Sequence, residues 1–336
     1  MYRSNHVLLD EKSPMCELKI ISGRANPKLA SDICESLHLE LGSITLGKHP
    51  DGENFCKIDD DVRGRDVFLI QPTCPPVNDN LMELLIMIDS CKRASASRIT
   101  AVVPYYGYAR QDRKDEGRVP ITAKLVANMI TRAGADRVLT MDLHAPQIQG
   151  FFDVPVDHLY AAPVLNSHFI EKGYNPDDIV VVSPDEGSIK RAIGHSKRLG
   201  GRLAIVDKRR DNSLVTVQKN IIGGPVDGKI CFMFDDMIST AGSILGAAEL
   251  VRKAGAKEIH LGATHGVLCG KAIENIRNAD IDSICITNTI PLTPEKQLDR
   301  IEVLSVASLL AEAIRRIHHH QSLSEMFRPP DSASEK

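Results

Sequence analysis

The chain has 336 residues, of which 43% are hydrophobic and 25% charged, with a formal net charge of −3. This composition is typical of a globular protein, and the length predicts about two domains. The small negative charge offers no basic surface for nucleic acid, and no apolar run reaches the ~18 residues of a membrane helix. We therefore expect neither nucleic acid nor a membrane as a partner.

Eight cysteines are present, none in a Cys-x-x-Cys pair, and several lie within apolar runs. Cysteine in such a setting behaves as a small hydrophobic residue, which favours a reducing compartment. The first 15 residues also lack the apolar core of a signal peptide. We expect a cytoplasmic protein.

Short apolar runs alternate with amphipathic helical patterns along most of the chain. The runs predict strands at 18–21, 67–70, 99–103, 137–141, 179–182, 203–206, 230–234, 259–263 and 284–287. The helical patterns lie at 27–37, 80–92, 121–133, 161–172 and 188–199. Strands alternating with helices predict an α/β fold of mostly parallel sheets flanked by helices.

An internal similarity indicates two related domains. Residues 127–144 align with 248–265, and both read as a helix end, an Ala-Gly-Ala stop and a strand that ends in histidine. Duplication is the favoured explanation, although two unrelated segments with the same strand–loop–helix pattern could also match by chance. The expected division is an N-terminal extension (1–16), two domains (17–160 and 161–327) and a disordered tail (328–336).

In the first half, a loop after the predicted strand 99–103 carries three tyrosines next to Arg110, Gln111 and further cations. Aromatic and basic residues together can bind single-stranded nucleic acid, but one short cluster in an acidic chain favours a nucleoside triphosphate instead. Arginine offers bidentate donors to phosphates, and glutamine can bond a sugar or base. A solvated charged loop remains an alternative.

A histidine, His144, follows the predicted strand 137–141, with Asp142, Asp153 and Asp157 nearby in sequence. One histidine with several carboxylates favours a hard ion such as Mg²⁺ over a closed zinc site. A structural histidine is the alternative reading.

Two predicted strands of the second half also end in polar residues. Asp185 follows the strand 179–182, at the sheet edge where open α/β folds bind ligands. Lys208 and Arg210 belong to a run of three cations after the strand 203–206. Such cations could close over a transferring phosphoryl group, or form a solvated turn.

The stretch 230–251 is the most informative. Five apolar residues predict a buried strand, Asp235 and Asp236 follow, and a loop from Ser239 through Thr240, Ala241 and Gly242 to Ser243 opens a helix. A helix N-terminus after a strand binds anions through free N–H groups. Carboxylates beside a phosphate cradle suit a sugar phosphate, although an ordinary strand-to-helix turn is the alternative. Neither a Walker A loop nor a Rossmann fingerprint is present here.

Six specific strings occur in order along the chain. They are NDNLMEL (78–84), GYARQDR (107–113), DLH (142–144), QIQGFF (147–152), DKRR (207–210) and LAEAIRR (310–316). With the loop at 235–243 they make the chain resemble the class I ribose-phosphate pyrophosphokinases over residues 17–327. The resemblance implies two similar phosphoribosyltransferase-like domains, the first on the ATP side and the second on the ribose 5-phosphate side.

The resemblance also implies a reaction and its residues. The family makes 5-phosphoribosyl 1-diphosphate and AMP from ATP and ribose 5-phosphate with Mg²⁺, as a homohexamer whose active sites are completed across subunits. The implied ATP contacts are Asp51, Gly52, Glu53, Arg110 and Gln111. The implied metal ligands are His144 and Asp185, with Asp142, Asp153 and Asp157 as weaker candidates. The implied catalytic cations are Lys208 and Arg210; Arg210, Asp235, Asp236 and the loop Ser239, Thr240, Ala241, Gly242 and Ser243 would hold ribose 5-phosphate.

The chain departs from the family pattern at several positions. Ser239 stands where the family usually has aspartate, Ser188 where it has glycine, and His49 where it often has phenylalanine. Two other functions remain open: a catalytically silent regulatory subunit, which Ser239 favours, and a base-using phosphoribosyltransferase, which the loop at 239–243 alone would permit.

Overall fold

The computed structural model describes residues 17–210 and 217–327. The strands are β1 (Leu18–Ser22), β2 (Ile44–Lys48), β3 (Asn54–Ile58), β4 (Asp66–Ile70), β5 (Arg98–Val103), β6 (Arg137–Met141), β7 (Val156–Leu159), β8 (Ile179–Ser183), β9 (Arg202–Arg210), β10 (Val217–Gly223), β11 (Ile230–Ile238), β12 (Glu258–Gly266), β13 (Ser283–Thr287) and β14 (Ile301–Leu304). The helices are α1 (Pro27–Leu37), α2 (Val77–Arg93), α3 (Thr122–Ala133), α4 (Ala162–Glu171), α5 (Ile189–Leu199), α6 (Gly242–Lys253), α7 (Ala272–Asn278) and α8 (Ala307–His318).

The first half contains a five-stranded parallel sheet in the order β1-β4-β5-β6-β7. Residues of β4 alternate between its two faces. Val67 and Leu69 pack with α2 and α3, whereas Phe68 and Ile70 pack with α1 and α8. A sheet covered on both faces needs a continuous apolar strand, which explains why the run predicted at 67–70 is apolar throughout.

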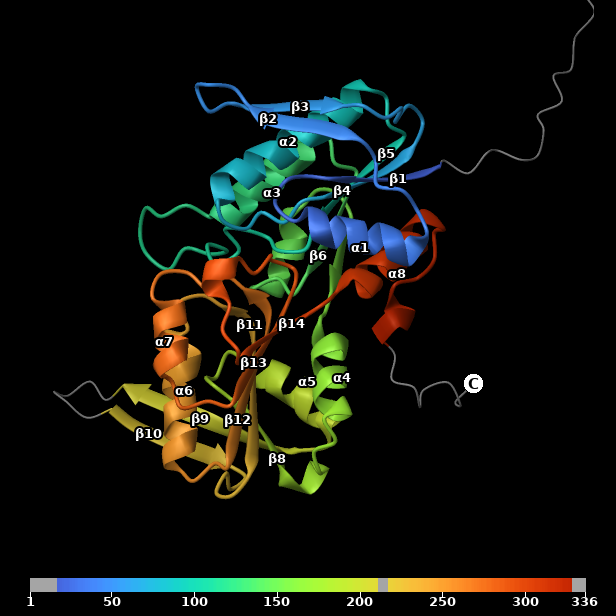
Figure 1. The fold of residues 1–336 in the computed structure, drawn as a ribbon. Helices are drawn as coiled ribbons and strands as arrows, with labels where there is room; N and C mark the ends of the chain where they lie inside the picture. The colour runs from blue at the N-terminus through green and yellow to red at the C-terminus, as the bar shows by residue number, and fades with distance from the viewer. Residues whose placement is uncertain (1–16, 211–216, 328–336) are drawn as a thin grey trace, which may run out of the picture.

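The second half contains a seven-stranded sheet in the order β10-β9-β8-β11-β12-β13-β14, parallel except for β10. The chain leaves β8 toward β9 on one side and returns through β11 on the other. Open α/β sheets bind ligands at the carboxyl ends of such a switch point. The predicted fold class, mostly parallel sheets flanked by helices, is confirmed (Figure 1).

Strand β11 is longer than the sequence predicted. Asp235 and Asp236 lie within it, because β12 runs beside it as far as the pairs Asp235–Ala263 and Ile238–Gly266. The pairing continues when Cys269 N donates to Ser239 O at 3.0 Å. The two carboxylates are therefore fixed by a sheet rather than by a turn.

The last helix, α8, packs on the first half of the chain. Within the expected domain 161–327, α8 crosses back and packs against α1 on the first sheet (Figure 1). Arg98 Nη2 donates to Ile317 O at 3.2 Å, and His318 Nδ1 lies 2.7 Å from Asp66 Oδ2. The apolar face of α8, which lies within the expected domain 161–327, is thus buried against the first half.

The predicted extension (1–16) and tail (328–336) lie outside the described residues. Among the helices that the structure describes, none is long and apolar enough to cross a membrane.

Candidate functional site

The two halves meet through the carboxyl ends of β6 and β12, the strands that end the two similar stretches of sequence. Thr264 Oγ1 donates to Asp142 Oδ2 at 2.6 Å, and His265 Nε2 lies 3.1 Å from Met141 O. An apolar cluster of Cys74, Tyr105, Met237, Val267 and Ile290 fills the adjoining space. The ligand-binding edges of both sheets therefore face one another.

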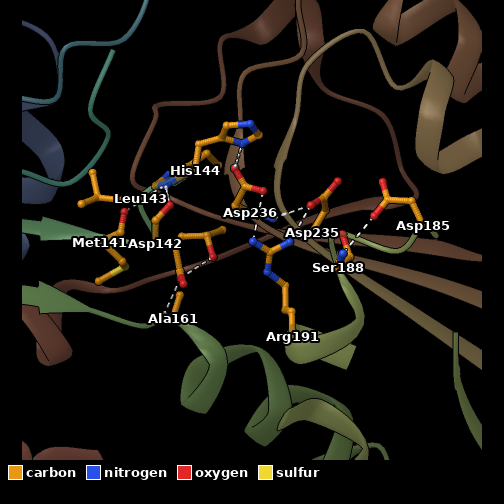
Figure 2. Close-up of polar contacts among 12 residues, drawn as sticks. Met141, Asp142, Leu143, His144, Ala161, Asp185, Ser188, Arg191, Asp235 and Asp236 are labelled. Carbon is orange, nitrogen blue, oxygen red and sulfur yellow. Dashed lines mark hydrogen bonds and ion pairs between the residues drawn. The ribbon is translucent and has the colours of Figure 1, made fainter. Parts of the chain in front are cut away.

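A network of charged side chains crosses this junction (Figure 2). His144 Nδ1 from the first half lies 2.8 Å from Asp236 Oδ2 in the second. Arg191, in the first turn of α5, donates to Asp235 Oδ1 at 2.6 Å and to Asp236 Oδ1 at 3.1 Å. The predicted sugar-binding acidic pair and the predicted metal ligand His144 are thus neighbours.

Arg191 is a residue that sequence reasoning missed. It lies in the helix predicted at 188–199, six residues after Asp185, and of these two residues only Asp185 was predicted as a ligand. The signal was its position in the helical turn that follows a strand at the carboxyl edge of the sheet. Removing Arg191 would leave the half-buried Asp235 without its ion-pair partner and the buried Asp236 with His144 alone.

The two carboxyl groups of the acidic pair have different pKa values. Burial, and then the charge of Asp236, raise the pKa of Asp235 to about 7. Burial also acts to raise the pKa of Asp236, but the hydrogen bond from His144 and the charge of Arg191 lower it to about 2. The hydrogen bond to Asp236 raises the pKa of His144. Asp236 is therefore the more acidic member of the pair, and Asp235 is the member that takes up a proton first as the pH falls.

The predicted phosphate loop leads directly into α6. Ala241 has φ +65 and α6 begins at Gly242, so the first turn of the helix leaves its N–H groups free to bind an anion. Thr240, Gly242 and Ser243 are exposed, whereas Ala241 is buried. Ser239 Oγ accepts a hydrogen bond from Arg110 Nη1 at 3.3 Å, which joins this loop to the first half.

The predicted ATP residues fall into two groups. Arg110 and Gln111 line a cavity of about 570 Å³, with Tyr105, Tyr108 and Met237 among its other walls. Asp51, Gly52 and Glu53 form the exposed turn between β2 and β3, where Glu53 N donates to Asp51 Oδ1 at 3.1 Å. This turn does not line the cavity in the described residues of one chain.

The predicted metal ligands differ in how far protein groups already engage them. Asp142 Oδ2 accepts hydrogen bonds from both Ala161 N and Thr264 Oγ1. Asp157 forms an ion pair with Arg137 at 2.7 Å, and Asp153 is exposed. Asp185 Oδ1 accepts only from Ser188 N at 2.9 Å among the hydrogen bonds of the described residues. His144 and Asp185 are the better placed candidates.

Only one group of three convergent His, Cys or carboxylate atoms occurs in the described part of the chain, at His168, Cys285 and Glu302. Glu302 is already held by Lys172 Nζ at 2.8 Å, and burial raises the pKa of the Cys285 thiol to about 12. An ammonium group thus already compensates this carboxylate, so the group is explained as an ion-pair cluster.

The predicted catalytic cations Lys208 and Arg210 have their backbone in β9, where Lys208 pairs with Lys219 of β10. Their side chains lie outside the described part of the structure.

Fold and site together define an α/β enzyme of the phosphoribosyltransferase-like class, with an acidic pair and a helix N-terminus at the switch point of the second sheet. Two family models match: the N-terminal domain of ribose phosphate pyrophosphokinase at residues 18–134, and the phosphoribosyl synthetase-associated domain at 216–328. The chain belongs to the ribose-phosphate pyrophosphokinase family, a family of transferases.

Named relatives support this placement over nearly the whole chain. The ribose-phosphate pyrophosphokinase of Rhodopirellula baltica is 74% identical over 94% of this chain and 99% of its own length. That of Thermotoga maritima is 54% identical over 93% of this chain and 98% of its own. The crystal structure of phosphoribosylpyrophosphate synthetase from Mycobacterium smegmatis is 43% identical, with a TM-score of 0.85 over 90% of this chain and 99% of that one.

Proposed function

We propose that the protein transfers the diphosphoryl group of ATP to the anomeric hydroxyl of ribose 5-phosphate, giving 5-phosphoribosyl 1-diphosphate and AMP. The contact that carries the proposal is His144 Nδ1 to Asp236 Oδ2 at 2.8 Å. It joins the nucleotide side of the first half to the sugar side of the second. A transfer between two substrates requires such adjacent sites.

Each substrate has a set of protein groups suited to it. Arg110 and Gln111 would bind ATP phosphates and nucleoside from the cavity wall. Asp235 and Asp236 would accept hydrogen bonds from ribose hydroxyls, and the N-terminus of α6 would hold the 5-phosphate. Lys208 and Arg210 would offset the charge that develops during transfer.

Mg²⁺ is the proposed cofactor, with His144 and Asp185 as the side chains that would hold it. Mg²⁺ in phosphoryl transfer is usually bound by one or two side chains together with substrate phosphates, not by a complete protein cage. The donors present fit this pattern, since neither of the two is saturated by hydrogen bonds within the described residues. When bound, the ion would neutralise charge on the phosphate oxygens.

We also propose a cytoplasmic homohexamer with active sites completed across subunits. The exposed turn Asp51–Glu53 lies off the cavity that holds Arg110, so a neighbouring subunit's turn is the simplest way to bring both groups to one nucleotide. The described cysteines are free thiols, which fits a reducing compartment.

The decisive experiment measures AMP formed from ATP with and without ribose 5-phosphate, and identifies the second product by ³¹P NMR. AMP release that requires the sugar phosphate, with a diphosphate ester as partner product, is the expected result. Release of AMP without the sugar, or none with it, would refute the proposal. A base-using phosphoribosyltransferase would instead consume the diphosphate ester and leave ATP intact.

A silent regulatory subunit is the second candidate, and Ser239 is the observation that favours it. Ser239 stands where the family usually has aspartate. Its uncharged hydroxyl accepts a hydrogen bond from Arg110, where an aspartate would place a negative charge. If the chain is active as proposed, Ser239→Asp should leave turnover unchanged or raise it, with a higher KM for ribose 5-phosphate because a second anion faces the phosphate. Wild-type protein with no turnover, rescued by Ser239→Asp, would establish the silent subunit.

A further inference from the structure

The string 78–84 begins in the first turn of α2, and the proposed reaction assigns it no role. Asn78 in this turn is exposed, and its Oδ1 accepts a hydrogen bond from the hydroxyl of Tyr108. Tyr108 lies two residues before Arg110 in the loop that follows β5. Asn78, Tyr108, Arg110 and Gln111 all line the same 570 Å³ cavity.

The backbone at Tyr108 adopts an unfavourable conformation. Its φ is +64, in the left-handed region that side chains other than glycine rarely occupy. The preceding Gly107 donates from N to Thr73 Oγ1 at 2.7 Å, and a Cβ at Gly107 would meet Thr73 O at 2.6 Å. The chain therefore turns sharply at 107–108, and a local contact must stabilise this turn.

The turn decides where the nucleotide-binding side chains point. Gln111 N donates to Tyr108 O at 3.0 Å, so Arg110 and Gln111 are tied to the conformation of Tyr108. The other two tyrosines of this loop act elsewhere. Tyr106 donates its hydroxyl to Ala123 O at 2.9 Å inside the first half, and Tyr105 packs between the halves.

We propose that Asn78 and Tyr108 are a pair of positioning residues for the nucleotide. Their hydrogen bond holds the left-handed turn, and the turn presents Arg110 and Gln111 to the cavity. The proposal rests on the proposed function in taking ATP as the occupant of this cavity. It assigns no chemical step to either residue.

The test compares Tyr108→Phe, Asn78→Ala and the double variant with wild type, by calorimetric titration of ATP and by steady-state kinetics. Each single variant is expected to weaken ATP binding roughly three- to tenfold, the effect of losing one net hydrogen bond. The KM for ribose 5-phosphate should stay unchanged. The double variant should be no worse than the singles, because either change alone already breaks the contact.

Tyr106→Phe is the matched control, since it removes a hydroxyl from the same loop away from the cavity. It is expected to lower the melting temperature while leaving ATP affinity unchanged. Unchanged ATP affinity in Asn78→Ala would overturn the proposal, because loss of Asn78 breaks the hydrogen bond that is proposed to hold the turn. A loss of affinity in Tyr108→Phe alone would then indicate that the Tyr108 hydroxyl contacts the nucleotide directly. Additive losses in the double variant would also overturn it. If the wild type lacked synthetase activity, the ATP titrations would still decide the role of the pair.

Discussion

At the scale of single residues, the unequal acidic pair has a direct consequence for stability. Because Asp235 keeps its proton up to about pH 7 in the folded protein, and loses it near pH 4 when unfolded, its burial destabilises the fold increasingly as the pH rises between these values. Asp236 acts in the opposite sense. Its lowered pKa contributes stability above pH 4 that is lost as the pH falls toward about 2.

Asp235→Asn is therefore expected to raise the melting temperature by a few degrees at pH 8, with the gain disappearing toward pH 4. Asp236→Asn is the matched comparison. It should lower the melting temperature at pH 8, because the substitution removes the anionic partner of His144 and Arg191. Thermal melts of the three proteins across this pH range check both signs. Equal shifts in melting temperature for the two variants at pH 8 would contradict the assignment of a raised pKa to Asp235 and a lowered pKa to Asp236.

Lys208 is a residue whose assigned role comes from the resemblance alone. Lys208→Ala is expected to reduce turnover about 10²–10³-fold while ATP affinity changes little, because a group that meets charge developing only during transfer acts on the transition state. Single-turnover kinetics and an ATP titration separate the two effects. Lys219, its partner across β9 and β10, provides a control substitution in the same ribbon. Wild-type turnover in Lys208→Ala would remove this residue from the mechanism.

At the scale of elements, α8 is the part of the second half that stabilises the first. Leu310, Ile314 and Ile317 are buried between α1 and the outer face of the first sheet. The hydrogen bonds of Arg98 and His318 fix the end of the helix at the amino edge of that sheet. Residues far apart in sequence thus form one core.

Leu310→Ala is expected to cost about 2–5 kcal/mol of unfolding free energy, because it leaves a cavity in this fully buried position. Hydrogen exchange should show lost protection in α1 and β1 rather than in β11 to β13. Val303→Ala, on an exposed position of β14, is the control and should change stability by less than about 0.5 kcal/mol. Protection lost first in the second sheet would contradict the placement of α8.

At the scale of the whole molecule, the two groups of predicted ATP residues suggest active sites shared between subunits. The turn with Glu53 and the loop with Arg110 belong to one chain, but among the described residues the turn is not part of the lining of the cavity that Arg110 borders. If neighbouring subunits supply them to each other, a defect in one can be complemented by the other.

Co-expression of Glu53→Ala and Arg110→Ala chains in equal amounts should therefore restore up to about one quarter of wild-type activity, since random mixing leaves one site in four with both groups intact. Each variant alone should be poorly active. Light scattering checks that the mixed protein is a hexamer. A mixed hexamer no more active than the average of its parents would show that each chain completes its own site.

The sequence alone determined the layered α/β character of this protein and the identity of most candidate side chains. The apolar runs at 67–70, 179–182 and 230–234 became the buried strands β4, β8 and β11, because a strand covered on both faces is apolar throughout. Local patterns also placed Asp185 and the loop at 239–243 beside the strands they follow. These signals are local, so they can be read without the fold.

Local patterns failed where an element depends on its partner. The strands β2, β3, β7, β10 and β14 were not predicted. They lie at sheet edges or in hairpins, where pairing rather than a buried apolar run defines the strand.

Only the tertiary structure decided which residues meet. It placed α8 on the first sheet, set His144 against Asp236 across 92 positions of sequence, and brought in Arg191 to hold both aspartates. It also brought Asp142 to Thr264 and Asp157 to Arg137, and in the described residues it left the turn Asp51–Glu53 out of the lining of the cavity that Arg110 borders. Contacts of this kind arise from strand pairing, from helices packed on a sheet and from the junction of the two sheets, and residue spacing along the chain carries no record of that geometry.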